Sequence, residues 1–303
     1  MSANPPESED ALRRAITSHP RVFENNRYVY PVLSRRSGGL SIGINLNPDK
    51  ICNFDCIYCQ VDRQTPPRDR QVDLDLLEHE LKALLEDARS GRIFGRPNFR
   101  DVPDDLKRIN DIAFSGDGEP TAYPRFREAV ERAAALKREL GLDDVKLIVL
   151  TNCTRFHRPD VLEALDIMHH HNGEIWAKLD AGTAPYYDLV DRSRVSFERI
   201  VENLRHAAQR WPLVIQTLLM RIRNEAPPEE EISAYCGVLK GVLDSGGRLK
   251  LIQLHTVARP PAESYVTPLP NEEMDRIASA VHRRLPDVPL QVHYGVKTEN
   301  QAD

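Results

Sequence analysis

Short apolar, β-branched runs alternate six times with amphipathic stretches along this chain, and this rhythm constrains its fold more than any other feature. Runs such as residues 147–150, Leu-Ile-Val-Leu, are apolar on both faces, which is typical of a strand covered on both sides. Strands that alternate with helices are parallel and are joined by right-handed crossovers. We therefore predict an α/β fold with parallel strands, a partial (β/α)6 TIM-type barrel. The predicted strands are residues 40–46, 109–114, 145–151, 174–180, 213–219 and 249–256.

The stretches between these runs carry apolar side chains at helical spacing. Leu74, Leu77, Leu81 and Leu84 fall on one face of a helix. The predicted helices are residues 74–85, 126–140, 159–168, 196–208, 229–242 and 271–281. We divide the chain into a short N-terminal extension (1–36), a barrel domain (37–295) and a tail (296–303).

Composition and charge restrict the function classes. A chain of 303 residues is long enough for one barrel. Its net charge of −5 does not support a broad nucleic-acid-binding surface, although a local basic patch remains possible. No run of 18 apolar residues predicts a membrane-spanning helix. The first residues lack the apolar stretch of a secretory signal, so we expect a cytoplasmic protein.

Three of the five cysteines, Cys52, Cys56 and Cys59, follow the first predicted strand in the pattern C-x3-C-x2-C. An odd number of cysteines with this clustering indicates a metal site in a reducing compartment rather than disulfides. A structural zinc ion takes four ligands, usually as two pairs, and no fourth cysteine or histidine lies nearby. A cubane iron–sulfur cluster held by three thiolates keeps one iron open for a small molecule. The cysteine spacing alone is therefore compatible with either a zinc site or an iron–sulfur cluster.

C-x3-C-x2-C with an aromatic residue before the last cysteine resembles the signature of the radical S-adenosylmethionine (SAM) superfamily. The resemblance implies that Cys52, Cys56 and Cys59 hold a [4Fe–4S] cluster. It implies that the amino and carboxylate groups of SAM chelate the fourth iron, and that Tyr58 packs near the adenine.

Residues 116–119 follow the second predicted strand and resemble the Gly-Gly-Glu element of this superfamily, which contacts the methionyl amine. Gly116 and Gly118 free the backbone to approach a ligand, and Glu119 is able to meet an ammonium group. Asp117 separates the two glycines, so the register of these contacts differs from the family pattern. Without the cysteine motif upstream, the segment would be an ordinary turn.

Polar residues end the third and fourth predicted strands. Asn152, Lys178 and Asp180 are expected at the barrel mouth, where they can bond ribose hydroxyls or a carboxylate. The alternative is that Asn152 and Asp180 cap the helices that follow.

Four further residues complete the predicted site. The resemblance implies that the ends of the last two predicted strands form an apolar wall for the adenine, at Met220 and Val257. Cys153 and His255 are catalytic candidates, as a radical-relay thiol and a substrate-facing imidazole. The alternatives are a packed small residue for Cys153 and a hydrogen-bonded core residue for His255.

Several other stretches narrow the resemblance to the wyosine-synthase-related branch, which has many bacterial members of unassigned substrate. Examples are Gly-Glu-Pro-Thr at 118–121, Lys-Leu-Asp-Ala-Gly at 178–182 and Arg-Pro-Pro at 259–261. True wyosine synthases act on a transfer RNA guanosine and carry a second cysteine cluster ahead of the first. This chain has no cysteine before Cys52, so the resemblance carries the chemistry and not that substrate.

The resemblance thus implies an enzyme that cleaves SAM reductively to a 5′-deoxyadenosyl radical. The radical takes a hydrogen atom from a small-molecule or nucleoside substrate, and a flavodoxin or ferredoxin supplies the electron. Two alternatives stay open: a radical enzyme acting on a protein or peptide, as an activase does, and a non-catalytic iron–sulfur or zinc protein.

Overall fold

The computed structural model describes residues 23–34 and 38–295, which form two compact units. Of these residues, those before Cys52, together with Pro66–Val149 and Glu163–Gly173, belong to the first unit. The second unit contains Cys52–Thr65, Leu150–Leu162 and the residues from Glu174 onward. The predicted tail and the first 22 residues of the predicted extension lie outside the described residues.

The sheet of the first unit begins with an antiparallel pair and continues with parallel strands. Its strands are β1 (Val29–Ser34), β2 (Gly39–Ile44), β3 (Ile109–Phe114) and β4 (Lys146–Thr151). Only β1 and β2 run antiparallel, whereas β2, β3 and β4 are parallel neighbours in chain order. The helices of this unit are α2 (Leu74–Arg89), α3 (Phe126–Glu139) and the larger part of α4 (Pro159–His170). Asp73 caps α2, because its carboxylate accepts from the backbone N–H groups of Asp75 and Leu76.

The second unit repeats the parallel strand and helix pattern. Its parallel strands, in spatial order, are β5 (Gly173–Lys178), β6 (Leu213–Ile222), β7 (Leu249–Thr256) and β9 (Leu290–His293). The short strand β8 (Val266–Pro268) pairs antiparallel with the end of β6. The helices are α5 (Ala184–Val190), α6 (Phe197–Arg210), α7 (Glu229–Asp244) and α8 (Asn271–Arg284).

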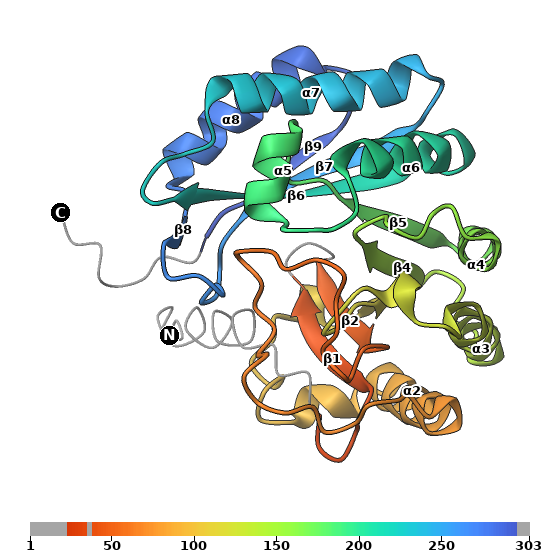
Figure 1. The fold of residues 1–303 in the computed structure, drawn as a ribbon. Helices are drawn as coiled ribbons and strands as arrows, with labels where there is room; N and C mark the ends of the chain where they lie inside the picture. Colours follow the sequence, from red (N-terminus) through yellow and green to blue (C-terminus); the bar gives the residue numbers. More distant parts are fainter. Residues whose placement is uncertain (1–22, 35–37, 296–303) are drawn as a thin grey trace. The chain divides into compact units, whose positions relative to one another are not determined.

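The two faces of the second unit's sheet have different partners. Figure 1 shows α7 and α8 on one side of this sheet, and the Thr217 hydroxyl lies 2.8 Å from the Tyr235 hydroxyl of α7. Side chains alternate along a strand, so Leu218 and Met220 point to the opposite face. There they form a buried apolar cluster with Ile57. This second face therefore receives the segment that carries the three clustered cysteines.

All six predicted strands and all six predicted helices form, with ends shifted by a few residues. The fold class is confirmed as α/β with mostly parallel strands, of the partial TIM-barrel type. The sequence analysis missed β1, β8, β9 and α5. Strands β8 and β9 have three and four residues, and α5 has seven, which is short for a periodic signal. Strand β1 lies within the stretch predicted as an extension. Within residues 23–34 and 38–295, none of the helices has the length and apolarity needed to cross a membrane.

Candidate functional site

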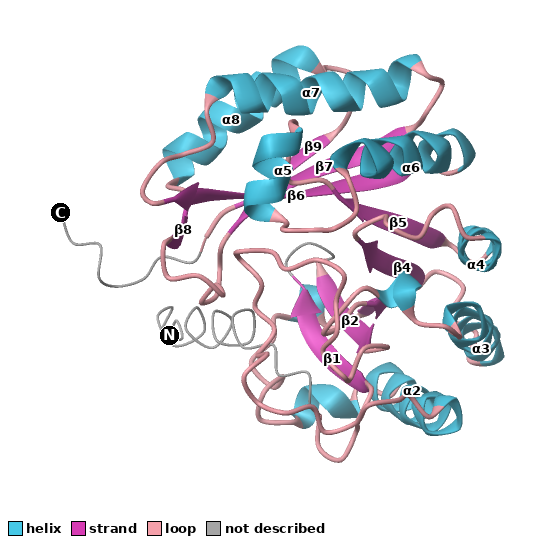
Figure 2. Cartoon of the chain, in the orientation of Figure 1, coloured by secondary structure: helices cyan, strands magenta, loops and turns pink. Residues whose placement is uncertain are grey.

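Residues 52–65, named the cysteine loop from here on, contain neither helix nor strand (Figure 2). The loop carries Cys52, Cys56 and Cys59, all of them half-buried. A turn joins the last two, because the Cys59 N–H donates to the Cys56 carbonyl at 3.0 Å. None of the chain's five cysteines is in a disulfide. One short loop thus presents three thiols.

The cysteine loop is fastened to its surroundings by backbone hydrogen bonds on both sides. The N–H groups of Asp55 and Ile57 donate to the carbonyls of Asp191 and Val190, at 3.1 and 2.9 Å. These carbonyls lie at the C-terminal end of α5, where orphan acceptors are available. On the other side, the Glu263 N–H donates to the Ile57 carbonyl at 3.0 Å. The shape of the loop therefore depends on α5, a helix that the sequence analysis did not predict.

A buried group of charges lies against the cysteine loop. The Lys178 ammonium is 2.6 Å from the Asp180 carboxylate and forms a second ion pair with Asp191. Tyr58 donates its hydroxyl hydrogen bond to Asp180, and the Cys56 thiol hydrogen-bonds Asp191. The structure thus brings together the predicted residues Tyr58, Lys178 and Asp180, and adds Asp191, which the sequence analysis missed.

The same ammonium lies over two aromatic rings of the loop. The Lys178 Nζ is 4.9 Å from the ring centroid of Phe54 and 5.4 Å from that of Tyr58. Burial opposes a charged lysine, but the two carboxylates outweigh it and hold the pKa of Lys178 well above its usual value. Burial also raises the pKa of the Cys56 thiol well above its usual value. A metal that binds Cys56 must therefore displace a tightly held proton.

Nitrogen donors are already directed at two of the three sulfurs. The Phe54 N–H donates to the Cys52 Sγ at 3.5 Å, and the Arg63 guanidinium donates to the Cys59 Sγ at 3.7 Å. A metal-bound sulfur accepts such hydrogen bonds, and donors around the ligands of a metal help to hold those ligands in place.

Asn152 contacts the cysteine loop through a second polar network. Its amide donates to the Asn53 Oδ1 at 2.7 Å, and the Asn53 amide donates to the Thr154 hydroxyl at 2.6 Å. The Thr154 hydroxyl in turn donates to the Asn152 Oδ1 at 2.8 Å. Three side chains from two loops thus form a closed ring of hydrogen bonds. Asn53 and Thr154 were missed by the sequence analysis, which had no signal for their proximity.

Met220 and Val257, the predicted adenine wall, lie in one apolar cluster with Ile57 of the cysteine loop. Tyr58 packs against this cluster from the loop side. The end of β6 and the residue that follows β7 thus contribute buried apolar side chains beside the aromatic ring that precedes Cys59.

His255 lies in a polar patch on the sheet face that receives the loop. It is paired in register with His293 of β9. Two residues earlier on each strand, the Gln216 amide donates to Gln253 at 2.8 Å and the Gln253 amide donates to Gln291 at 3.3 Å. Three glutamine amides on neighbouring strands thus form a ladder beside His255.

Cys153 has a different environment from the three loop cysteines. It is fully buried and has a positive φ of 63°. Its thiol lies 3.6 Å from the Thr151 carbonyl, and its own carbonyl accepts from the Asn203 amide of α6 at 2.8 Å. These contacts are those of a packed residue in a tight turn.

In the first unit, residues 116–119 form a tight turn on Asn45. The Asn45 amide donates to Asp117 at 2.7 Å, and the Asp117 N–H donates back to the Asn45 Oδ1 at 3.1 Å. A Cβ at Gly116 would lie 2.2 Å from that same Oδ1, and a Cβ at Gly118 would lie 2.2 Å from the Ile51 carbonyl. Only glycine fits both positions without a shift of the neighbouring atoms.

Glu119, the acidic residue of this turn, is buried and acts as a cap. Its carboxylate accepts from the Thr121 N–H at 3.1 Å at the start of a 3-10 helix, η3 (Pro120–Ala122). The carboxylate is thereby held in one orientation.

The three thiols of the cysteine loop suit an iron–sulfur cluster better than a single metal ion. Among the described parts of the chain, no three His, Cys, Asp or Glu side chains converge on one metal ion. A cubane cluster makes a different demand, because each thiolate binds a different iron. Three thiols on one loop, with N–H donors at two sulfurs, fit that demand.

The family described as the radical SAM superfamily matches residues 46–233, which is more than half of the chain. The chain belongs to the radical SAM superfamily. Radical SAM proteins are enzymes that use an iron–sulfur cluster and SAM. The UPF0026 protein of Helicobacter pylori is 29% identical over 237 residues, which are 76% of this chain and 62% of the relative. The chain thus spans about three fifths of the length of that relative.

Two solved structures share the radical SAM fold of this chain. A structure of TYW1 with a lysine–pyruvate adduct bound has a TM-score of 0.57 at 16% identity, covering 93% of this chain and 90% of TYW1. Streptococcus suis SuiB bound to S-adenosylmethionine has a TM-score of 0.56 at 12% identity, covering 86% of this chain and 52% of SuiB.

Proposed function

We propose that Cys52, Cys56 and Cys59 hold a [4Fe–4S] cluster, and that this radical SAM chain cleaves SAM reductively to act on a small-molecule or nucleoside substrate. When bound, the cluster supplies the electron that splits SAM into methionine and a 5′-deoxyadenosyl radical. The observation that carries the proposal is the cysteine loop itself. It presents three thiols and directs N–H donors at the sulfurs of Cys52 and Cys59.

We assign the orientation of the adenine to Tyr58 and its neighbours. The Tyr58 hydroxyl is tied to Asp180, so the ring cannot turn freely. Met220 and Val257 are buried in the apolar cluster against which Tyr58 packs. An aromatic ring held in this way suits a nucleobase, because aromatic side chains stack on the face of a base.

Polar contacts to the rest of SAM are assigned to the strand ends. Asp180 accepts from the Leu218 N–H at 2.8 Å as well as from Tyr58 and Lys178, so its carboxylate is fixed in direction. Carboxylate oxygens accept hydrogen bonds from hydroxyl groups such as those of ribose. Asn152, fixed in its hydrogen-bonded ring, offers an amide for the same purpose.

The proposal includes an electron donor and a compartment. A flavodoxin or ferredoxin is the proposed donor, because the chemistry consumes single electrons at low potential. The cysteines, none in a disulfide, suit the reducing cytoplasm, which is the proposed location.

Anaerobic reconstitution with iron and sulfide tests the proposal. We expect about four irons and four sulfides per chain, an EPR signal after reduction, and formation of 5′-deoxyadenosine when SAM and a reductant are added. Alanine at Cys52, Cys56 or Cys59 should abolish all three. The matched control is Cys236→Ala, which removes a buried thiol of α7 outside the loop. A wild-type protein that binds only zinc, or makes no 5′-deoxyadenosine, would overturn the proposal.

Deuterium-labelled candidate molecules then identify the substrate class. Transfer of deuterium from a metabolite or nucleoside into 5′-deoxyadenosine supports the proposed class. Transfer only from a labelled protein or peptide would replace it by the activase-like alternative.

A further inference from the structure

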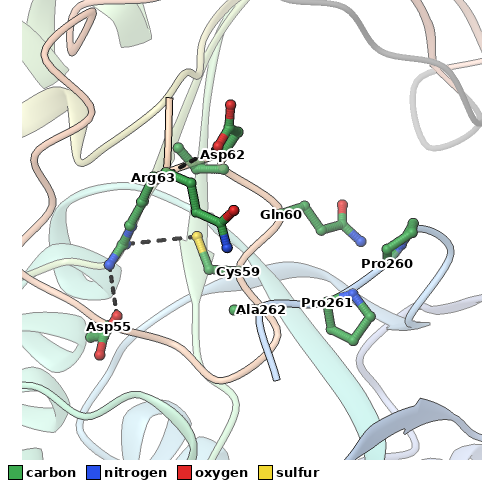
Figure 3. A pocket seen from close by; sticks show the side chains of 10 residues that line it. Asp55, Cys59, Gln60, Asp62, Arg63, Pro260, Pro261 and Ala262 are labelled. Carbon is green, nitrogen blue, oxygen red and sulfur yellow. Dashed lines mark hydrogen bonds and ion pairs between the residues drawn. The ribbon is translucent and has the colours of Figure 1, made fainter. Parts of the chain in front are cut away.

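Arg63 braces the cysteine loop from within a surface pocket (Figure 3). Its Nη1 donates to the Asp55 carboxylate at 2.7 Å. Its Nη2 donates to the Phe54 carbonyl at 3.3 Å and to the Cys59 Sγ at 3.7 Å. One guanidinium therefore joins the early part of the loop to its last cysteine. Arginine is suited to this role, because its planar fork makes several hydrogen bonds in fixed directions.

The pocket has a volume of about 300 Å³ and reaches the Cys59 side chain. Loop residues from Cys59 to Gln64 line one side, and Pro260, Pro261 and Ala262 line the other (Figure 3). The Gln60 amide ties the two sides together by donating to the Arg259 carbonyl at 3.2 Å. Cys59 thus lies at the surface edge of the loop, with Arg63 as the cation in direct contact with its sulfur.

We infer that Arg63 sets the reduction potential of the cluster proposed for this loop, by donating a hydrogen bond to Cys59 and holding a positive charge beside it. The inference rests on the proposed function. Reduction adds one negative charge to a cluster, so a neighbouring cation and N–H donor stabilise the reduced form more than the oxidised form. Hydrogen bonds to the sulfurs and net charge are among the factors that set the potential of an iron–sulfur cluster. Arg63 therefore raises the potential.

Arg192 provides a matched control on the same surface. Its side chain is 37% exposed against 35% for Arg63, and it also approaches Asp55, at 3.7 Å. Its guanidinium is directed to Glu263 and the Tyr265 hydroxyl, both at 2.7 Å. Removing Arg192 thus deletes one positive charge near the loop and spares the hydrogen bond to Cys59.

Potentiometric titration of the reconstituted protein, followed by EPR in the absence of SAM, tests the inference. We expect Arg63→Ala to lower the equilibrium constant for reduction about tenfold, which is 59 mV for one electron. Arg63→Lys keeps the positive charge and should lower the equilibrium constant for reduction by a smaller factor. Arg192→Ala should stay close to the wild type. Iron content and thermal unfolding, measured on every variant, show which proteins are folded and loaded.

The outcomes distinguish a failure of this inference from a failure of the proposed function. If Arg63→Ala does not hold a cluster, Arg63→Lys and Arg63→Gln carry the same comparison with Arg192→Ala. A loaded wild type whose Arg63 variants keep its potential, or match Arg192→Ala, overturns the inference and leaves the proposed function intact. A wild type that binds no cluster overturns the proposed function, and the inference with it.

Discussion

The Lys178 ammonium lies 2.6 Å from the Asp180 carboxylate, directly beside the cysteine loop. Asp191 makes a second ion pair with the same ammonium. Two carboxylates and one ammonium leave a net negative charge in a buried place. Because buried charges are costly unless they are paired, the position of each group depends on the other two. This triad links the end of β5 to α5 and, through Tyr58 and Cys56, to the loop.

Lys178→Met replaces the ammonium by an apolar side chain of similar length. We expect the metal-free protein to lose about 3 kcal/mol of unfolding free energy, because two buried carboxylates lose their counter-ion. Urea denaturation measures this. Adding Asp191→Asn to the variant should recover part of the loss. The control, Lys240→Met, removes an exposed ammonium paired with Asp244 and should cost less than about 0.5 kcal/mol. Equal stability of the Lys178 variant and the wild type would contradict the prediction.

Gly118→Ala tests the tight turn of the first unit. The added Cβ would lie 2.2 Å from the backbone oxygen of Ile51, so the turn must shift. We expect a loss of about 1–3 kcal/mol in unfolding free energy. Gly237→Ala is the control, since nothing lies within 4 Å of its Cβ position and alanine favours helix α7. It should gain up to about 1 kcal/mol. Similar stability changes in the two variants would show that the turn tolerates a side chain.

Tyr187→Phe tests a pH dependence. Tyr187 of α5 donates to the Val195 carbonyl at 2.9 Å, and burial raises the pKa of Tyr187 to about 12. An unfolded tyrosine loses its proton near pH 10. Between about pH 10 and 12 the folded state therefore binds more protons than the unfolded state, and stability falls as pH rises. The variant should lose about 1 kcal/mol at pH 7, where one hydrogen bond is missing. Above pH 10 the unfolding free energy of the variant should fall less steeply than that of the wild type. If both unfolding free energies fall in parallel, ionisation of Tyr187 does not contribute to the pH dependence of stability.

Asn152→Ala opens the hydrogen-bonded ring that includes Asn53. We expect the reconstituted protein to release iron faster to a chelator, because the start of the cysteine loop loses a fixed partner. Gln209→Ala, which removes an exposed hydrogen bond to the Ser245 carbonyl, should release iron at the wild-type rate. The absorbance of the iron–chelator complex follows both reactions. Equal rates of iron release in the two variants would show that the hydrogen-bonded ring does not help to hold the cluster.

Much of the fold was predictable because the information is local. The apolar runs of β3 and β7 appear in the sequence with the bounds that they have in the structure. Apolar spacing also predicted α2, and the structure adds an Asp73 cap at its start. Elements whose shape depends on partners were missed: α5 has only seven residues, and β9 is an edge strand of four.

The candidate site divides in the same way. Cysteine spacing predicted Cys52, Cys56 and Cys59, and position at a strand end predicted Asp180, without any knowledge of the fold. The family resemblance predicted Tyr58. Spacing did not identify Asp191, which lies at the end of an unpredicted helix, or Arg63, which lies four residues beyond the last cysteine.

The sequence by itself determined the family and the cysteine spacing from which the chemistry is predicted, because these features lie in short, continuous segments of the chain. Only the tertiary structure decided which charges and donors accompany those thiols. Asn53 and Asn152 are 99 residues apart in the chain, yet their side chains lie within 2.7 Å. Such contacts depend on how packed strands and helices bring distant parts of the chain together, which neither hydrophobic periodicity nor a local motif predicts.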